Sequence, residues 1–264
     1  MLKHPDFDPI AIHIGSGGIH WYGLMYLVAF TSAWYLGRVR ARKKNSGWLQ
    51  DDVADVMFYT ALGVILGGRL GYILFYDFAN FIEHPLNIFK IWQGGMSFHG
   101  GLIGSALGLW LYGRKTKRTF FQVTDFMIPL FPLGYAAGRL GNFINGELWG
   151  RVTDVPWAML FLQVDDKPRH PSQLYQLFLG GIVIFIIIWL YSNKPRPTMA
   201  VSGLFLMLFG CYRIFVEFFR EPDKHLGYIA FDWMTMGQIL SVPMVIIGAF
   251  MLWKAYRKSS PTGA

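Results

Sequence analysis

The chain has 264 residues, of which 53% are hydrophobic and 15% are charged, against roughly 25% charged residues in soluble domains. With a mean hydropathy of +0.35, this composition excludes an ordinary soluble domain and predicts an all-α, polytopic integral membrane protein. The net charge of +8 is no sign of nucleic-acid binding, because membrane proteins collect Lys and Arg on their cytoplasmic side. The single cysteine, Cys211, excludes an internal disulfide and is expected to pack as a small hydrophobic residue.

Seven apolar runs approach the roughly 20 residues that a helix needs to cross a bilayer. They are predicted at Ile19–Gly37, Val53–Tyr76, Met96–Tyr112, Phe121–Leu140, Leu174–Tyr191, Met199–Phe219 and Met234–Trp253. We expect the first run to stay in the mature protein, because the residues before it lack the features of a cleavable signal peptide. A short interfacial helix is expected at Leu86–Trp92. Residues 1–264 are therefore predicted to form one seven-span domain, with 142–171 inserted as a small periplasmic head.

The basic residues are distributed unevenly between the two sides of these spans. Fourteen Lys and Arg follow the first, third, fifth and seventh runs, and seven lie on the opposite side. Because basic residues near span ends remain in the cytoplasm, the N-terminus is predicted to be periplasmic and the C-terminus cytoplasmic. The three remaining arginines, Arg69, Arg139 and Arg213, fall inside predicted spans.

Small residues recur every four positions on the second and third runs. The glycines in this pattern are Gly63, Gly67, Gly71, Gly100, Gly104 and Gly108. Small residues at this spacing let two helix backbones approach closely in lipid. The pattern predicts close helix packing and says little about chemistry.

A polar stretch ends the fourth run. Arg139 and Asn142 are three residues apart and share a face if the segment is helical. We expect Gly141 and Gly146 to bend the chain so that Glu147 approaches that face. A cation, an amide and a carboxylate at a membrane edge indicate a site for an anionic, lipid-sized substrate. The alternative is an arginine that only extends to the interface from a helix end.

Two further positions are candidates for chemistry. Arg213 and Glu217 are four apart on the sixth run, where ionisable residues are costly and usually functional, although a structural ion pair is the alternative. His99 lies among glycines at the start of the third run, where a ligand can approach closely, but a solitary histidine is also a common packing residue. Arg69 either joins the other intramembrane arginines in a basic cluster or pairs with carbonyl groups.

An aspartate cluster at Asp51, Asp52 and Asp55 has the composition of a magnesium–diphosphate motif. It lies at the predicted cytoplasmic start of the second run, and no second cluster faces it. Acidic residues stabilise helix N-termini, and we favour that role. We expect no metal and no cofactor.

Several runs together closely resemble one protein family, bacterial prolipoprotein diacylglyceryl transferase. The matching runs are WYGLMY at Trp21–Tyr26, HGGLIG at His99–Gly104, GRLGNFINGELWGR at Gly138–Arg151, RHPSQLYQ at Arg169–Gln176 and YRIFVEFFREPD at Tyr212–Asp223. The resemblance covers essentially the whole chain in order, and the combination is far more specific than any single run.

The resemblance implies a seven-span enzyme of the bacterial inner membrane. Such an enzyme takes diacylglycerol from phosphatidylglycerol, attaches it by a thioether to the lipobox cysteine in the signal peptide of a prelipoprotein, and releases glycerol phosphate, the first step of lipoprotein maturation. Matched motif by motif, phosphatidylglycerol binding falls on Arg139, Asn142, Gly150 and Arg213. Catalytic roles fall on Tyr22, His99, Asn142, Glu147, Arg213 and Glu217.

The means of activating the substrate thiol stays open. A free thiol with a pKa of about 8.5 is only partly ionised at neutral pH, so a base at His99 is one hypothesis. Glu147 and Glu217 are competing bases, but we expect Arg139 and Arg213 to hold both as carboxylates. Alternatively, the field of the arginines alone favours the thiolate.

Two other function classes share some of these features. A transporter also uses intramembrane Arg and Glu, but it would often show inverted repeats, and no such repeat is found. An intramembrane hydrolase needs its own nucleophile, and Ser97 and His99, two residues apart, point away from each other on a helix.

Overall fold

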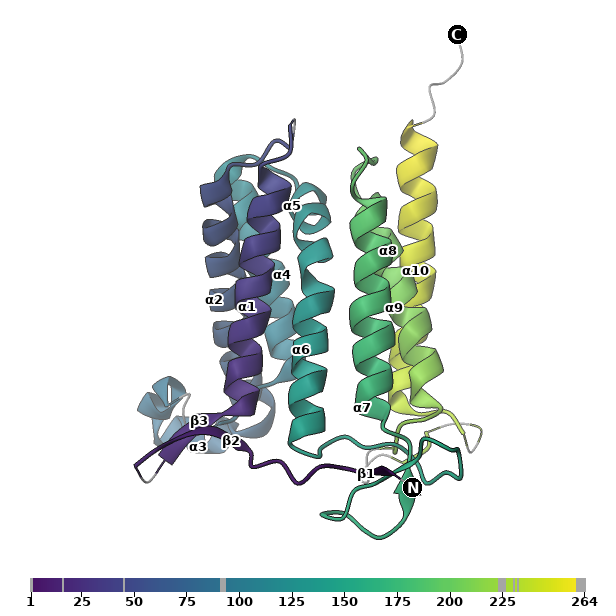
Figure 1. Ribbon diagram of the computed structural model, residues 1–264. Helices are drawn as coiled ribbons and strands as arrows, with labels where there is room; N and C mark the ends of the chain where they lie inside the picture. Colours follow the sequence, from purple (N-terminus) through teal and green to yellow (C-terminus); the bar gives the residue numbers. More distant parts are fainter. Residues whose placement is uncertain are drawn as a thin grey trace. The chain divides into compact units, whose positions relative to one another are not determined.

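The computed structural model describes residues 2–15, 17–44, 46–90, 94–222, 227–229, 231 and 233–259. These residues are mostly helical, with a few short strands (Figure 1). The chain forms two compact units: unit 1 comprises Met1–Tyr35 and Met127–Ala264, and unit 2 comprises Leu36–Phe126. Helix α1 (Trp21–Ala41) belongs to both, because the division falls within it.

Unit 2 is built on the pairing of α2 (Gln50–Tyr76) with α4 (Phe98–Thr116). The predicted close packing of these helices through glycines is confirmed. A Cβ atom added to Gly104 would lie 2.0 Å from the carbonyl oxygen of Gly63. One added to Gly67 would lie 2.3 Å from the carbonyl oxygen of Gly100. No side chain fits between the two backbones at these points.

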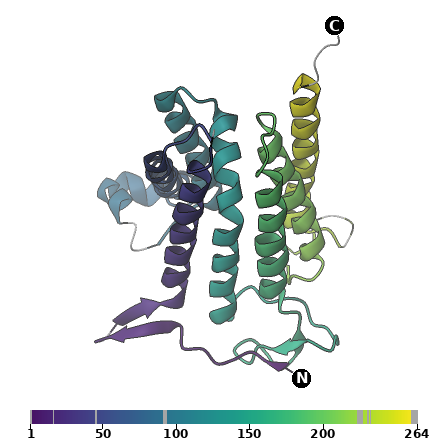
Figure 2. The same ribbon diagram turned by 45° about the horizontal axis from the view of Figure 1, so that its top comes forward.

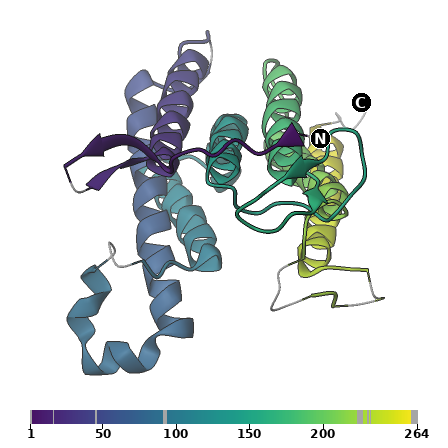
Figure 3. The same cartoon turned by 60° about the horizontal axis from the view of Figure 1, so that its bottom comes forward.

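The connection between α2 and α4 forms a small arc, shown in blue in Figure 3. It contains α3 (Phe78–Glu83) and the 3-10 helix η1 (Pro85–Phe89). The interfacial helix expected at Leu86–Trp92 is therefore shifted and shorter, because Pro85 favours the first turn of a helix. Residues 91–93 lie outside the described part of the chain. Unit 2 also holds most of α5 (Phe120–Met127).

Unit 1 begins with strands that the all-α prediction missed. Strands β2 (Ile10–Ile14) and β3 (Gly17–His20) form an antiparallel hairpin that leads into α1 (Figure 2). Strand β1 (Leu2–Lys3) pairs in parallel with β4 (Met159–Leu160), which pairs with β5 (Pro168–Arg169). Strands β1, β4 and β5 have two residues each, and β2 (IAIHI) and β3 (GGIH) show no strict alternation of apolar and polar residues, so the sequence pattern does not reveal them.

Prolines and a π-helix interrupt two of the predicted spans. The fourth run is helical from α5 through the 3-10 helix η3 (Ile128–Leu130), where Pro129 lies, to α6 (Phe131–Ile144). The fifth run begins as α7 (Ser172–Tyr175), continues as the π-helix η4 (Gln176–Val183) and ends as α8 (Ile184–Tyr191). π-Helical turns inside α-helices frequently occur at functional sites.

The last two helices, α9 (Ala200–Glu217) and α10 (Met236–Ser259), lie side by side (Figure 1). Glycines again bring the backbones together: a Cβ atom on Gly248 would lie 2.4 Å from the backbone nitrogen of Met207. A buried apolar cluster joins α8 to α9 and consists of Ile184, Ile188, Val201, Tyr212 and Val216.

Four helices of the described part are long and apolar enough to cross a membrane. They are Gln50–Tyr76, Ser172–Tyr191, Ala200–Glu217 and Met236–Arg257. The chain is therefore a membrane protein. The other three predicted spans correspond to α1, α4 and the stretch from α5 to α6. Cys211 is exposed on α9, so it does not pack against the protein as the small hydrophobic residue that was expected.

We predict that Gly104→Ala destabilises the protein and that Gly101→Ala does not. Gly101 lies on the same helix, but its added Cβ atom would meet Val64 only at 3.6 Å, an ordinary contact. Alanine favours a helix over glycine by up to about 1 kcal/mol, whereas an overpacked core costs about 1–3 kcal/mol. Thermal unfolding in detergent measures both, and equal midpoints would show that α2 and α4 can move apart freely.

Candidate functional site

The polar stretch at the end of α6 folds as a compact turn. Arg139 donates a hydrogen bond from Nη1 to Oδ1 of Asn142 at 3.2 Å, which confirms that the two share a face. Asn142 Nδ2 in turn donates to Oε2 of Glu147 at 3.3 Å. Gly146 has a φ of +65°, a conformation that favours glycine, and the Glu147 N–H bonds the Asn142 carbonyl at 2.8 Å. The predicted approach of Glu147 is therefore confirmed.

Gly141 does not bend the chain as predicted. It lies within α6, where a Cβ atom would come within 3.0 Å of the Tyr22 ring. Tyr22, in the first turn of α1, thus packs directly against the backbone next to Asn142. Its ring also meets the Tyr26 ring edge to face, with centroids 5.3 Å apart. The structure therefore brings Tyr22 to the helix that carries Arg139 and Asn142.

The Arg139 guanidinium has few partners. Its Cζ atom lies 4.8 Å from the centre of the Tyr135 ring, one turn earlier in α6. Among the described residues, the Arg139 side chain forms a hydrogen bond with Asn142 but no ion pair with a carboxylate. A guanidinium carries five N–H donors in a planar fork. Most of the donors of Arg139 are therefore left for a ligand, and an anion with several oxygens suits them.

A second cluster surrounds Glu217 at the end of α9. Its carboxylate is fully buried, and it accepts hydrogen bonds from Arg213 Nη2 at 3.2 Å and from Arg220 Nε at 3.0 Å. The Arg151 guanidinium donates to the carbonyl oxygens of Glu217 and Arg220 at 3.2 Å and 2.9 Å. The predicted pair of Arg213 and Glu217 is confirmed as a contact, and a second arginine completes it.

Gly150 joins the turn after α6 to the end of α9. It pairs with Arg220 as a single antiparallel bridge, and its N–H donates to the His170 carbonyl at 2.9 Å. A Cβ atom at Gly150 would lie 2.5 Å from the carbonyl oxygens of both His170 and Phe219. The position of Gly150 is explained by this close approach of three backbone segments.

The Glu147 turn is also held from α7. Gln173 Nε2 donates to the carbonyl oxygen of Glu147 at 2.6 Å, and Ser172 Oγ donates to that of Leu148 at 2.8 Å. Both donors are fully buried. The exposed Glu147 side chain is thus carried by a backbone that two buried groups fix in place.

Arg169 fastens the strand segment to the same loop. It bonds both carboxylate oxygens of Asp165, at 2.6 Å and 3.1 Å, and it also reaches the Gly150 carbonyl and Glu221. The hydrogen bond from Arg169 lowers the pKa of Asp165, and Asp165 raises the pKa of Arg169. Burial lowers the pKa of His170, the next residue. Arg169 thus has acidic partners, unlike Arg139.

His99 lies in unit 2, at the start of α4. The Ser97 hydroxyl caps this helix by accepting the N–H of Gly100 at 3.2 Å. The His99 side chain is exposed, and its ring meets the Phe98 ring edge to face. Within the described part of the chain it has no hydrogen bond, so its imidazole is open to a partner from outside.

Arg69 pairs with carbonyl groups, the second of the two roles considered for it. Its guanidinium donates to the carbonyl oxygens of Asn87, Ile88, Gly94 and Gly95. The residue is only 7% exposed. It therefore fixes the connection that leads into α4 and is not left open to an anion.

Asp52 likewise has a structural role. It accepts the Leu49 N–H at the start of α2 and pairs with Arg118, each at 2.9 Å. Asp55 pairs with Lys115 at 3.7 Å. The contact with Leu49 agrees with the capping role favoured from the sequence, whereas the two ion pairs join α2 to Lys115 in α4 and to Arg118 after it.

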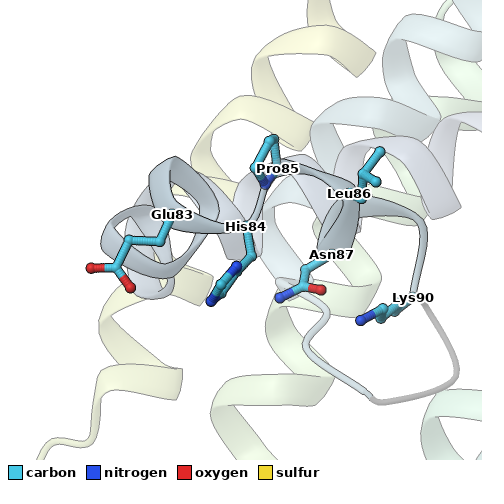
Figure 4. Close-up of a pocket in the computed structure, with 6 residues that line it drawn as sticks. All are labelled: Glu83, His84, Pro85, Leu86, Asn87 and Lys90. Carbon is cyan, nitrogen blue, oxygen red and sulfur yellow. The ribbon is translucent and has the colours of Figure 1, made fainter.

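A hollow of about 510 Å³ lies on the arc between α2 and α4. Figure 4 shows the side chains around it, which are Glu83, His84, Pro85, Leu86, Asn87 and Lys90. None of them is a predicted site residue, so this hollow adds nothing to the polar clusters of unit 1.

Several residues of the clusters escaped the sequence analysis. Arg220 is not among the predicted site residues, although its spacing of three from Glu217 could have revealed the pair. Arg151, Ser172 and Gln173 act across long sequence separations, and no local pattern announces them. Tyr135 is one turn from Arg139, a spacing that could have been noticed.

Comparison with known proteins identifies the family. Residues 9–254 match the family described as prolipoprotein diacylglyceryl transferase. The chain is 58% identical over 257 residues to the phosphatidylglycerol–prolipoprotein diacylglyceryl transferase of Coxiella burnetii (strain RSA 331 / Henzerling II), covering 97% of this chain and 98% of the relative. It is also 58% identical over 253 residues to the enzyme of that name from Legionella pneumophila (strain Lens), covering 96% and 99%. The chain therefore belongs to the prolipoprotein diacylglyceryl transferase family and is a transferase.

Proposed function

We propose that this protein transfers the diacylglyceryl group of phosphatidylglycerol to the lipobox cysteine of a prelipoprotein. The observation that carries this proposal is the Arg139 guanidinium, which has one amide partner and an aromatic ring beneath it but no carboxylate among the described residues. A lipid phosphate suits the remaining donors. The names of the relatives support the choice of phosphatidylglycerol and prolipoprotein as substrates.

The reaction forms a carbon–sulfur bond and breaks a carbon–oxygen bond. The cysteine thiolate attacks the glyceryl carbon, the phosphate ester leaves as glycerol phosphate, and the thiol proton passes to a base or to water. Arginines paired to the phosphate stabilise the negative charge that grows on the leaving group. Asn142 orients Arg139, and Arg213 is the second proposed cation, oriented by Glu217. The nucleophile belongs to the substrate, so Cys211 need not react.

The remaining predicted residues take supporting roles in this proposal. Gly150 permits the close approach that sets the loop after α6, and Tyr22 packs on α6 beside Asn142. Glu147 presents an exposed carboxylate that Asn142 fixes. No metal or other cofactor enters the proposed reaction.

We propose the bacterial inner membrane as the location, with seven spans and a periplasmic head formed by residues 142–171. The four apolar helices support a membrane protein, and the bias of basic residues supports a periplasmic N-terminus and a cytoplasmic C-terminus. The phosphate site would then face the periplasmic leaflet, on the side where secreted prelipoproteins emerge.

Reporter fusions test this orientation. Fusions near Asp165 and at Ala264, which lies outside the described residues, should report opposite sides of the membrane. The physical reason is the excess of Lys and Arg in the loops after the odd-numbered spans. If both fusions report the same side, the seven-span arrangement is wrong and the site lies in the other leaflet.

A lipidation assay with labelled phosphatidylglycerol and a lipobox peptide tests the function and Arg139 together. Wild-type protein should form the thioether, and both Arg139→Lys and Arg139→Ala should lose most activity, because lysine keeps the charge but not the two-pronged fork. Arg114→Lys is the control, since Arg114 also lies over an aromatic ring, 5.6 Å from that of Trp110. Lack of thioether formation by folded wild type would refute the function, and full activity of Arg139→Lys would refute the fork.

We propose His99 as the base that takes the thiol proton, or as the group that orients the thiol. The pH–rate profile of His99→Gln tests this. The variant should lose the acidic limb at about pH 6–7 that an imidazole base produces, with a rate loss of roughly 10²–10⁴-fold. His84→Gln is a matched control in the same unit. A His99→Gln enzyme that keeps the wild-type profile would leave the arginine field as the means of thiol activation.

A further inference from the structure

Two tyrosine hydroxyl groups and a glutamine amide form a series of hydrogen bonds at the ring on which Arg139 lies. The Tyr135 and Tyr212 hydroxyl oxygens are 2.6 Å apart, and the Tyr135 hydroxyl also donates to Oε1 of Gln176 at 3.2 Å. Because Tyr135 uses its proton on Gln176, Tyr212 donates to Tyr135. The series of hydrogen bonds therefore runs from Tyr212 on α9, through Tyr135 on α6, to Gln176, the first residue of the π-helix η4.

These two hydrogen bonds hold the hydroxyl end of the Tyr135 ring. Tyr212 is buried and Gln176 is fully buried, so neither partner can swing into water. Gly180 leaves the space that the pair needs: a Cβ atom there would lie 2.5 Å from Tyr212 Cζ and 2.8 Å from Tyr135 Cε1. The position of the Tyr135 ring is thereby restricted by two hydrogen bonds at its hydroxyl and by the close backbone of Gly180.

The Arg139 guanidinium lies over this ring, with its Cζ atom 4.8 Å from the ring centre. A guanidinium stacks on an aromatic face and is attracted by it, most strongly where water is scarce. Asn142 contacts the guanidinium at Nη1, so ring and amide together restrict its tilt. A two-pronged bond to a phosphate depends on that tilt.

We propose that Tyr135 is a positioning residue for the phosphate-binding Arg139, and that Tyr212 and Gln176 hold Tyr135 in place. This inference rests on the proposed function of Arg139. A Phe would fill the same space as either tyrosine, so packing alone leaves the two hydroxyls unexplained. Their effect should appear in the affinity for phosphatidylglycerol and in kcat, since the group whose orientation changes binds the phosphate and also stabilises its charge as it leaves.

The test is binding of a short-chain phosphatidylglycerol to the full chain in detergent, together with steady-state lipidation. Tyr135→Leu removes the platform and should raise the Kd and KM about tenfold, the effect of losing a desolvated cation–π contact. Tyr135→Phe and Tyr212→Phe keep the ring but release it, and should raise both constants by about threefold. In all three, kcat at saturating lipid should fall as well, because a misaligned guanidinium stabilises the leaving phosphate less well.

Tyr191→Phe is the matched control. Its hydroxyl lies 2.7 Å from that of Tyr256, a pair of the same kind in the same unit, at a site where it can be lost without touching Arg139. This variant should keep the wild-type Kd. Unfolding midpoints of all variants separate a loss of affinity from a loss of folded protein, and Tyr135→Phe remains informative if Tyr135→Leu does not fold.

Two variants of Arg139 distinguish a failure of this inference from a failure of the proposed function. If Arg139→Ala binds the lipid as wild type does, the proposed role of Arg139 is wrong. If Arg139→Ala weakens binding but Tyr135→Leu and Tyr212→Phe do not, Arg139 binds phosphate and the positioning role is wrong. Tyr212→Phe should have no further effect in Arg139→Lys, because an ammonium group has no plane to orient, and an undiminished effect there would also overturn the proposal.

Discussion

The fully buried carboxylate of Glu217 is the constraint on which the end of α9 depends. A buried charge costs several kcal/mol unless it is paired, and removing one partner of such a group costs about 3–5 kcal/mol. Arg213 and Arg220 meet both oxygens of this carboxylate, at 3.2 Å and 3.0 Å. Arg151 binds the carbonyl groups around it. Through Gly150, the same junction fixes the turn that follows α6.

The arginines of the chain differ in what surrounds them, and this difference separates structure from proposed chemistry. Carbonyl oxygens fill the donors of Arg69, and Asp165 and Glu221 neutralise Arg169. Glu217 is shared by Arg213 and Arg220, so these two arginines together keep one net positive charge. Arg139 has only an amide oxygen and a ring face within the described residues. The free donors of Arg139 suit a bound anion with several oxygens.

The sequence predicted the helices well and the clusters in part. Apolar runs located helices to within a few residues, and the glycine repeat gave the contact of α2 with α4, because both follow from local spacing. The spacing of Arg139 and Asn142, and of Arg213 and Glu217, gave two contacts for the same reason. Arg151, Gln173 and Tyr212 join segments far apart in the chain, and such contacts leave no local pattern. The short strands were missed because none shows a clear alternation of apolar and polar residues.

Family membership decides between the function classes that composition left open, since a transporter or a hydrolase would be no transferase. A transfer reaction of this kind needs few polar groups from the protein. Where the substrates bring both nucleophile and leaving group, the protein needs only fixed cations and a means to orient them. A charge held rigid before the reaction needs no reorganisation during it. The Arg139 guanidinium is held in this way by the Tyr135 ring and the Asn142 amide. Gln173 in turn fixes the loop that follows α6 by its hydrogen bond to the Glu147 carbonyl.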